Sequence, residues 1–146
     1  MSHVLNVSPG NPIWVFEENY RLFMRLLPVV LGEGERLTLV SHRADGDLRL
    51  RVVEDARYTT TLELSKPFSI DNQWLPDLIM KVRIYYDAEV VEVMGYQGCD
   101  RIPPRYQVSR HGRFHRDEKR QVNYLLNDLL RHCLRYDYRL VSDVNA

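Results

Sequence analysis

The sequence has few cysteines, no long apolar run and no net charge, and these absences exclude several classes of protein. Cys99 and Cys133 are too few for the disulfide framework of small secreted domains. No apolar stretch approaches the roughly 20 residues that a membrane-spanning helix needs. Residues 1–10 contain neither a basic segment nor an apolar segment typical of secretion signals. We therefore expect a cytoplasmic protein without a membrane partner.

What is present is typical of a globular domain. Hydrophobic residues make up 45% and charged residues 27% of the chain, which excludes a disordered tail, a coiled coil and a collagen-like fibre. A length of 146 residues corresponds to one domain, since domains usually have roughly 100–200 residues. We predict a single domain spanning residues 1–146 that folds without a disulfide or a metal.

Lysine is also scarce, and the basic residues are unevenly distributed. Only three of the 20 basic residues are lysines. Residues 1–100 carry a net charge of −5, whereas residues 101–120 carry +5. The planar fork of arginine suits carboxylate and phosphate groups, although a GC-rich genome would also favour arginine codons. The local cluster at 101–120 is harder to explain by codon usage.

Two segments have the periodicity of amphipathic helices. The first follows Asn11 and Pro12, which suit the N-cap and the first helical position. Its expected apolar stripe is Ile13, Phe16, Tyr20, Phe23 and Leu27, with Trp14 beside the stripe against a neighbouring element. Asp117 can cap the second helix, whose expected stripe is Val122, Leu125, Leu126, Leu129, Cys133 and Leu134.

About five segments between these helices alternate apolar and polar residues, as half-buried strands do. They lie near residues 37–40, 48–53, 58–64, 80–85 and 90–94, with a tight turn at Asp45-Gly46. We expect residues 67–77 to form a loop, because they contain two prolines and an Asp-Asn pair. The short connections predict a two-layer α+β domain: an antiparallel meander of about five strands, with both helices on one face.

Several segments together resemble the YqiB-like family of small uncharacterised gammaproteobacterial proteins, a domain of unknown function. The most specific string is FHRDEKRQVN at 114–123, followed by LLRHCL at 129–134. RYTT at 57–60 and VRIYYDA at 82–88 fit the same pattern, as do residues 19–28. The resemblance covers about residues 20–134.

The family resemblance implies no activity, cofactor or catalytic residue. Its genes tend to lie beside genes for nucleotide-hydrolysing enzymes, which hints at nucleotide signalling or turnover. Where the family pattern has a histidine before the aspartate of a strand turn, this chain has Tyr86. No chemistry is therefore assigned to that position.

The Arg/His-rich segment 101–120 is the main candidate site. It leads into a helix N-terminus, where free N–H groups and positive potential favour an anion. Tyr106 and Phe114 could stack on a base or a sugar. The opposing interpretation is a solvated loop whose arginines pair with the acidic first hundred residues. The candidate ligand-binding residues are Arg105, Tyr106, Arg110, Arg113, His115, Arg116 and Lys119.

Polar residues of the predicted strands form a second candidate. They should share the sheet face opposite the helices, and basic residues mixed with an aromatic are typical of some RNA-binding sheets. A solvated face is the simpler interpretation, because antiparallel sheets commonly expose one face to water. These residues are Arg49, Arg51, Thr59, Thr61, Glu63, Lys81, Arg83 and Tyr85.

The sequence predicts neither a metal site nor a catalytic group. His111 and His115 have a zinc-like spacing, but no cysteine pair precedes them. There is no nucleophile elbow, P-loop or dinucleotide-binding glycine motif. Asp87, next to Tyr86, suits a turn better than a catalytic role. We expect no cofactor.

These observations favour a non-enzymatic binding or adaptor protein that recognises an anionic partner: a nucleotide, a phosphate or a nucleic-acid backbone. One alternative is an enzyme or accessory factor in nucleotide or phosphoester turnover, which clustered carboxylates or a metal would support. Another is a protein–protein interaction module anchored by Trp14, Trp74 or Tyr136. The oligomeric state and the identity of the partner stay open.

Overall fold

The computed structural model describes residues 13–27, 32–70, 73–97 and 116–141, giving only the backbone at 68–70, 73–77, 97 and 116–120. The elements follow one another in the order α1 (Ile13–Leu26), β1 (Arg36–Val40), β2 (Leu48–Asp55), β3 (Thr59–Ile70), β4 (Gln73–Tyr85), β5 (Val90–Gln97), α2 (Arg116–Arg135) and β6 (Arg139–Val141).

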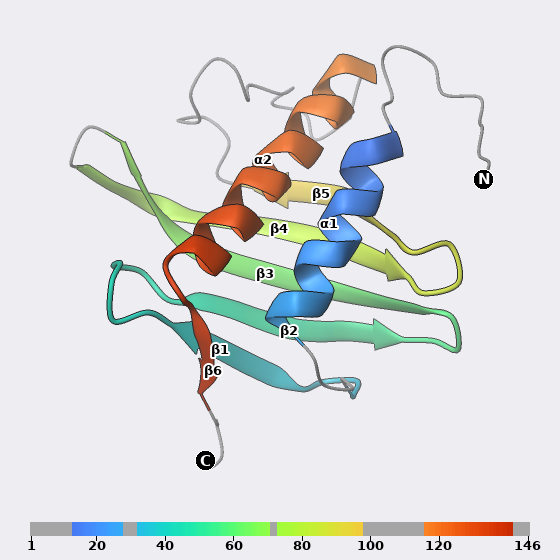
Figure 1. The fold of residues 1–146 in the computed structure, drawn as a ribbon, viewed down its shortest axis with the longest axis horizontal. Helices are drawn as coiled ribbons and strands as arrows, with labels where there is room; N and C mark the ends of the chain where they lie inside the picture. The colour runs from blue at the N-terminus through green and yellow to red at the C-terminus, as the bar shows by residue number, and fades with distance from the viewer. Residues whose placement is uncertain (1–12, 28–31, 71–72, 98–115, 142–146) are drawn as a thin grey trace.

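The strands form one antiparallel sheet in the order β5-β4-β3-β2-β1-β6, and both helices cover the same face of it (Figure 1). The predicted α+β class and the meander are therefore confirmed. The expected number of strands was one too low, because the short β6 returns after α2 to pair with β1, with Leu140 opposite Leu39. In the described part of the chain, no helix is long and apolar enough to cross a bilayer.

Alternation along each strand separates a buried face from an open one. Leu48, Leu50 and Val52 of β2 point to the core, whereas Arg49 and Arg51 between them are exposed. The same phase in β3 and β4 aligns apolar residues under the helices. The largest fully buried side chains are Phe23, Leu39, Leu48, Leu62, Leu64, Met80, Ile84, Leu126 and Leu130.

The expected loop at 67–77 is wrong, because β3 continues to Ile70 and β4 begins at Gln73. The two arms pair as far as Ile70 opposite Gln73, so they form a long hairpin. The register shifts between Lys66 and Phe68, and this irregular stretch contains Pro67 and, on the facing strand, Pro76. Proline lacks the N–H that a regular ladder requires, and irregularities of this kind are where sheets tolerate it.

The apolar stripe expected for α1 is also wrong, because the buried face of the helix is rotated from it by part of a turn. The residues of α1 that are buried are Val15, Asn19, Leu22, Phe23 and Leu26. Ile13 is exposed, and Tyr20 is only partly buried. The buried polar residue Asn19 lies in the centre of the face that packs on α2 and β5. A search for apolar residues at helical spacing does not include an asparagine. Trp14 contacts Tyr124 of α2, as expected, with ring centroids 5.7 Å apart.

The end of α2 holds the β1–β2 loop in place. The Tyr138 N–H donates to the carbonyl of Cys133, and Asp137 adopts a positive φ of 61°. The chain thereby leaves the helix in a left-handed turn and enters β6. The Tyr138 hydroxyl then donates to the carbonyl of Gly46 at 2.6 Å. Gly46 has a φ of 88°, a conformation that favours glycine, but the connection from β1 to β2 covers residues 41–47 and is therefore a longer loop than the tight turn expected at Asp45-Gly46.

Candidate functional site

Most of the site predicted at 101–120 lies outside the described residues. That applies to Arg105, Tyr106, Arg110, Arg113 and His115. The backbone of α2 begins at Arg116 and includes Lys119, so these two residues occupy the first turns of a helix. Their side chains are outside the description. The proposed convergence of these seven residues therefore stays a prediction.

The open face of the sheet has the arrangement of side chains that the alternation predicted. Arg51 lies opposite Glu63 across β2 and β3, and Glu63 lies opposite Lys81 across β3 and β4. A bulge between Val52 and Glu54 shifts the register of β2 by one residue. Glu54 therefore lies opposite Thr61, which in turn lies opposite Arg83, so these residues share the open face. Arg36 and Thr38 of β1 and Ser65 of β3 extend this face, and the sequence analysis missed them. Arg36 and Thr38 alternate with the buried Leu37 and Leu39, and this alternation could have identified Arg36 and Thr38 as residues of the open face.

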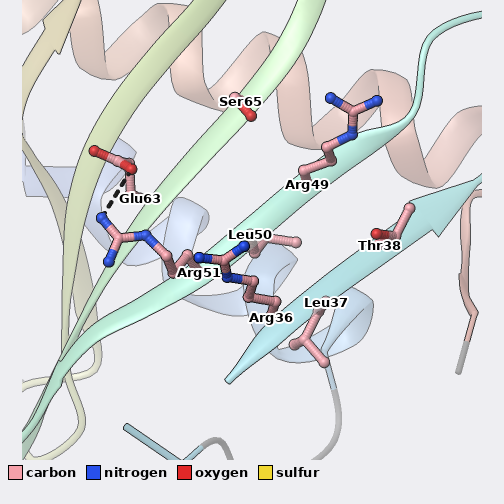
Figure 2. A pocket seen from close by; sticks show the side chains of 8 residues that line it. All are labelled: Arg36, Leu37, Thr38, Arg49, Leu50, Arg51, Glu63 and Ser65. Atoms are coloured by element: carbon pink, nitrogen blue, oxygen red, sulfur yellow. Dashed lines mark hydrogen bonds and ion pairs between the residues drawn. The ribbon is translucent and has the colours of Figure 1, made fainter. Parts of the chain in front are cut away.

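An open pocket of about 300 Å³ lies at the β1–β2–β3 end of this face. Figure 2 shows Arg36 and Arg51 reaching toward Glu63, with Arg49 further along β2 near Ser65 and Thr38, and the helices behind the sheet. The pocket is therefore on the side away from α1 and α2. It is lined by Arg36, Leu37, Thr38, Arg49, Leu50, Arg51, Glu63 and Ser65.

The charges of this pocket are unbalanced. Arg51 Nη2 lies 3.2 Å from Glu63 Oε1, and both side chains are about two-fifths exposed, at 45% and 38%. Within the described residues, neither Arg36 nor Arg49 has an acidic partner within 4.0 Å. Arg36 also lies directly opposite Arg51 in the β1–β2 register. Like charges at such positions repel one another, so the pocket favours an anion that would neutralise them.

The remainder of the open face is better compensated. The Arg83 Nε–H donates to the hydroxyl of Thr61 at 3.0 Å, and Arg83 Nη2 lies 3.9 Å from Glu54 Oε1. The Tyr85 hydroxyl donates to Glu92 at 3.4 Å. Among the described residues of this face, Arg36 and Arg49 at the pocket and Lys81 on β4 have no acidic partner within 4.0 Å.

The face under the helices contains a polar cluster at the opposite end of the sheet. The Thr60 hydroxyl donates to Asp55 Oδ1 at 3.0 Å and lies 2.8 Å from the hydroxyl of Tyr86. Thr60 is buried, so these bonds satisfy a polar group that would otherwise be costly to bury. Tyr86 therefore joins two hairpins of the sheet.

A second buried cluster lies where α2 ends. Lys66 points from β3 toward the helix side, is 9% exposed and places its ammonium 5.5 Å from the centre of the Tyr138 ring. Burial lowers the pKa of Lys66 and of the neighbouring His132. Burial raises the pKa of Cys133 to about 11 and that of Tyr138 to about 12. In this packed corner, where Cys133 is fully buried, burial disfavours the charged form of each of these four side chains.

The residues suggested as protein-binding anchors do not come together in the described structure. Trp14 is 51% exposed, whereas Tyr136 is partly buried with Arg43 and Arg135 over its ring. The Trp74 side chain lies outside the description. The other described large apolar residues that are exposed are Ile13 next to Trp14 in α1, Tyr58 between β2 and β3, Met94 in β5, and Leu140 and Val141 in β6. In the described segments, no three His, Cys, Asp or Glu side chains are grouped to hold a metal ion.

The comparisons with known proteins agree with the family resemblance. A family model described as "Protein of unknown function (DUF1249)" matches residues 22–139. The "Uncharacterized protein YqiB" of Escherichia coli K12 is 39% identical over 119 residues, which is 81% of this chain and 82% of that protein. The proteins of the same name from the O6:H1 and O157:H7 strains match equally well. No solved structure matches the chain.

Proposed function

Because the chain belongs to the DUF1249 family of proteins of unknown function, we propose its function from its own surface: a non-enzymatic binding or adaptor protein that recognises an anionic partner. The observation that carries the proposal is the pocket between Arg36, Arg49 and Arg51 on the open sheet face. The sequence analysis proposed the same ligand chemistry for a different segment, 101–120.

The pocket suits binding for three physical reasons. Guanidinium groups donate paired N–H bonds to carboxylate or phosphate oxygens, and such charge-assisted bonds are the stronger ones. The arginines project from strands of a continuous sheet, which holds them more firmly than a loop would. The hydroxyls of Thr38 and Ser65 flank Arg49 across the register and add uncharged donors.

The lining favours binding over catalysis. Glu63 is the one carboxylate among the eight lining residues, and Arg51 already engages it. A general base needs a carboxylate that is available to the substrate. An enzyme of nucleotide or phosphoester turnover would therefore need groups beyond this lining.

The segment 101–120 stays a separate proposal for the same class of ligand. Arg116 begins α2, which belongs to the helix layer, whereas the pocket lies on the other face of the sheet (Figures 1 and 2). The arginines of the pocket and the first turn of α2 should thus be tested by different substitutions. Binding at either place would fit an adaptor for an anionic partner.

The proposal is tested by replacing the two arginines that have no described acidic partner. We expect the double variant Arg36→Gln/Arg49→Gln to bind anions at least tenfold more weakly than the wild type, in titrations with inorganic phosphate, heparin and an oligonucleotide. Each charge-assisted bond contributes about 1.5–3 kcal/mol, and about 1.4 kcal/mol corresponds to a factor of ten.

Arg83→Gln is the matched control, because Arg83 lies on the same face but outside the pocket. It removes one positive charge and should change the affinity less than twofold. Because the double variant removes two charges and the control one, a loss of binding free energy in the control about half that in the double variant would show that only the overall charge matters. Unchanged binding in the double variant would remove the pocket from consideration.

A further inference from the structure

We propose that the ligand of the arginine pocket is a phosphomonoester, and that Glu63 is a counter-anion which the phosphate displaces from Arg51. This inference rests on the proposed function and specifies the chemistry of the same site. It is drawn from three features of the open face: where its carboxylates lie, how its arginines are spaced, and how weakly the Arg51–Glu63 pair is held.

The carboxylates of the open face favour a small anion over a long one. Glu63 lies on β3 at the border of the pocket, opposite both Arg51 and Lys81. Further along the same face, Glu54 lies opposite Thr61, and Glu92 lies opposite Arg83. Outside the pocket, Glu54 and Glu92 lie beside Lys81 and Arg83, so this part of the face has no surplus positive charge to hold a longer chain of phosphates. An anion confined to the pocket meets only Glu63.

The spacing of the arginines suits a group with several oxygens. Arg36 and Arg51 are direct cross-strand neighbours, a geometry that places Cβ atoms about 4.5–5.5 Å apart. Arg49 lies two residues from Arg51, about 6.6–6.8 Å along the same strand. Figure 2 shows the side chains of Arg36 and Arg51 extending to the same side, toward Glu63, and that of Arg49 extending away from them, so a phosphate would contact Arg36 and Arg51 together and would recruit Arg49 by rotation of its side chain. A carboxylate has only two oxygens, whereas a phosphomonoester has three terminal oxygens.

The charge of the ligand follows from the same residues. Arg36 and Arg49 provide two positive charges for which the described residues supply no acidic partner. A phosphomonoester carries about −1.5 to −2 at neutral pH, because its second pKa is near 6. Once Glu63 has left Arg51, three arginines face the ligand, so a dianion neutralises two of the three charges. A phosphodiester, with a single negative charge, neutralises only one of them.

Glu63 is placed to exchange with this ligand. Its contact with Arg51 is a single 3.2 Å bond between two partly exposed side chains, and such pairs are held weakly. A phosphate in the pocket offers Arg51 more charge and more oxygens than Glu63 does. Binding would thus release Glu63 toward Lys81, its other cross-strand neighbour.

The experiment measures affinity by calorimetry at constant ionic strength. The probes are inorganic phosphate, phosphoserine, adenosine 5′-monophosphate, dimethyl phosphate and a ten-residue oligothymidylate. We expect the phosphomonoesters to bind at least tenfold more tightly than the diester, and their affinity to fall between pH 7.5 and 5 as the dianion is protonated. A difference between phosphoserine and the nucleotide identifies the source of the phosphate.

Two variants isolate the role of Glu63. Glu63→Gln removes the competing charge and should tighten phosphate binding at least threefold. Glu54→Gln is the matched control, since it removes a carboxylate from the same face outside the pocket, and should leave the affinity within a factor of 1.5. Equal effects of the two variants would overturn the displacement of Glu63.

The remaining outcomes separate this inference from the proposed function. If the oligothymidylate or the diester binds through Arg36 and Arg49 but the monoesters do not, the ligand class is wrong and the anion-binding function stands. If Arg36→Gln/Arg49→Gln changes the binding of no probe, the proposed function of the pocket fails as well. Monoester binding that depends on both arginines supports the inference.

Discussion

Lys66 is an enclosed charged side chain, and the carboxylates of Asp47 and Asp45 oppose part of the effect of burial on its pKa. It is 9% exposed, and its ammonium faces the Tyr138 ring 5.5 Å away. Burial lowers its pKa from 10.5, because the enclosed site disfavours the charged form. β3 continues through residue 66 and places it on the same face as Leu62 and Leu64, whereas the strand predicted from the sequence ended near residue 64, so neither the direction of Lys66 nor its enclosure by Tyr138 was predicted.

We expect Lys66→Met to raise the free energy of unfolding at pH 7 by about 1 kcal/mol, since replacing a buried charge by an apolar chain is often stabilising. Below the lowered pKa, the ammonium is charged in both the folded and the unfolded states, so the full burial penalty applies. As the pH rises through the lowered pKa toward 10.5, the folded state loses its proton first and the penalty disappears. The wild type should therefore approach the variant in stability.

Urea unfolding at several pH values measures both effects. Lys81→Met is the control, because Lys81 is exposed on the open face and should change the stability by less than about 0.5 kcal/mol. A variant that is less stable than the wild type at pH 7 would mean that the ammonium over the Tyr138 ring is a net stabilising contact.

Cys133 should be chemically inert in the folded protein. Its thiol is fully buried, and burial raises its pKa to about 11 from 9.0. Because the thiolate is the reactive species, the shift lowers its fraction about a hundredfold near pH 8. In a Cys99→Ser background, we expect iodoacetamide to label Cys133 at least a hundredfold more slowly in the native protein than in urea. Equal rates would show that the corner below α2 opens readily.

At the scale of the elements, the sequence predicted the helices and the strands better than their contacts. The phase of α1 was missed because its packing face contains a hydrogen-bonded asparagine. Asn19 is fully buried, donates to the carbonyl of Asn123 at 3.2 Å and accepts from Asn127 at 2.9 Å. Asn123 in turn accepts the backbone N–H of Val93 in β5. Such a network depends on three elements meeting, which no local periodicity records.

The remaining differences at this scale have similar causes. The long β3–β4 hairpin is compatible with Pro67 and Pro76 only because a register shift occurs there, and a register exists only between two paired strands. The three residues of β6 are too few to show a period of their own. Their pairing with β1 depends on the turn that ends α2 at Asp137.

Asn19→Ala should destabilise the junction of α1, α2 and β5. It removes both the acceptor for Asn127 and the donor for the Asn123 carbonyl. Since each buried polar group that loses its partner costs about 1–3 kcal/mol, we expect a loss of about 2–4 kcal/mol in urea unfolding. Arg25→Ala, at an exposed position of the same helix, is the control and should cost less than about 0.5 kcal/mol. A loss for Asn19→Ala as small as for the control would mean that water replaces the network.

At the scale of the whole molecule, the protein has one face covered by helices and one open face with arginines. The sequence predicted that Arg49, Arg51 and Glu63 share a face, because alternation is a local property. It did not predict the pocket, which requires β1 to bring Arg36 opposite Arg51 and depends on the register between two strands. The neutral total charge likewise gave no indication that positive charge gathers at one end of the sheet.

The segment 101–120 is the other basic region of the molecule. We expect Arg113→Ala/Arg116→Ala to weaken the binding of nucleotides, heparin or nucleic acid with little change in the melting temperature. The start of α2 at Arg116 offers free N–H groups and positive potential to an anion. Each charge-assisted contact that is lost should cost about 1.5–3 kcal/mol where it is shielded from water.

The layered fold provides the control for this prediction. α2 covers the face opposite the pocket, so the effects of Arg113→Ala/Arg116→Ala and Arg36→Gln/Arg49→Gln on the binding free energy should add in the quadruple variant (Figure 1). Unchanged binding together with a large fall in melting temperature would assign Arg113 and Arg116 to pairing with the acidic first hundred residues. A combined effect no larger than that of one pair would instead mean that both regions contact a single ligand.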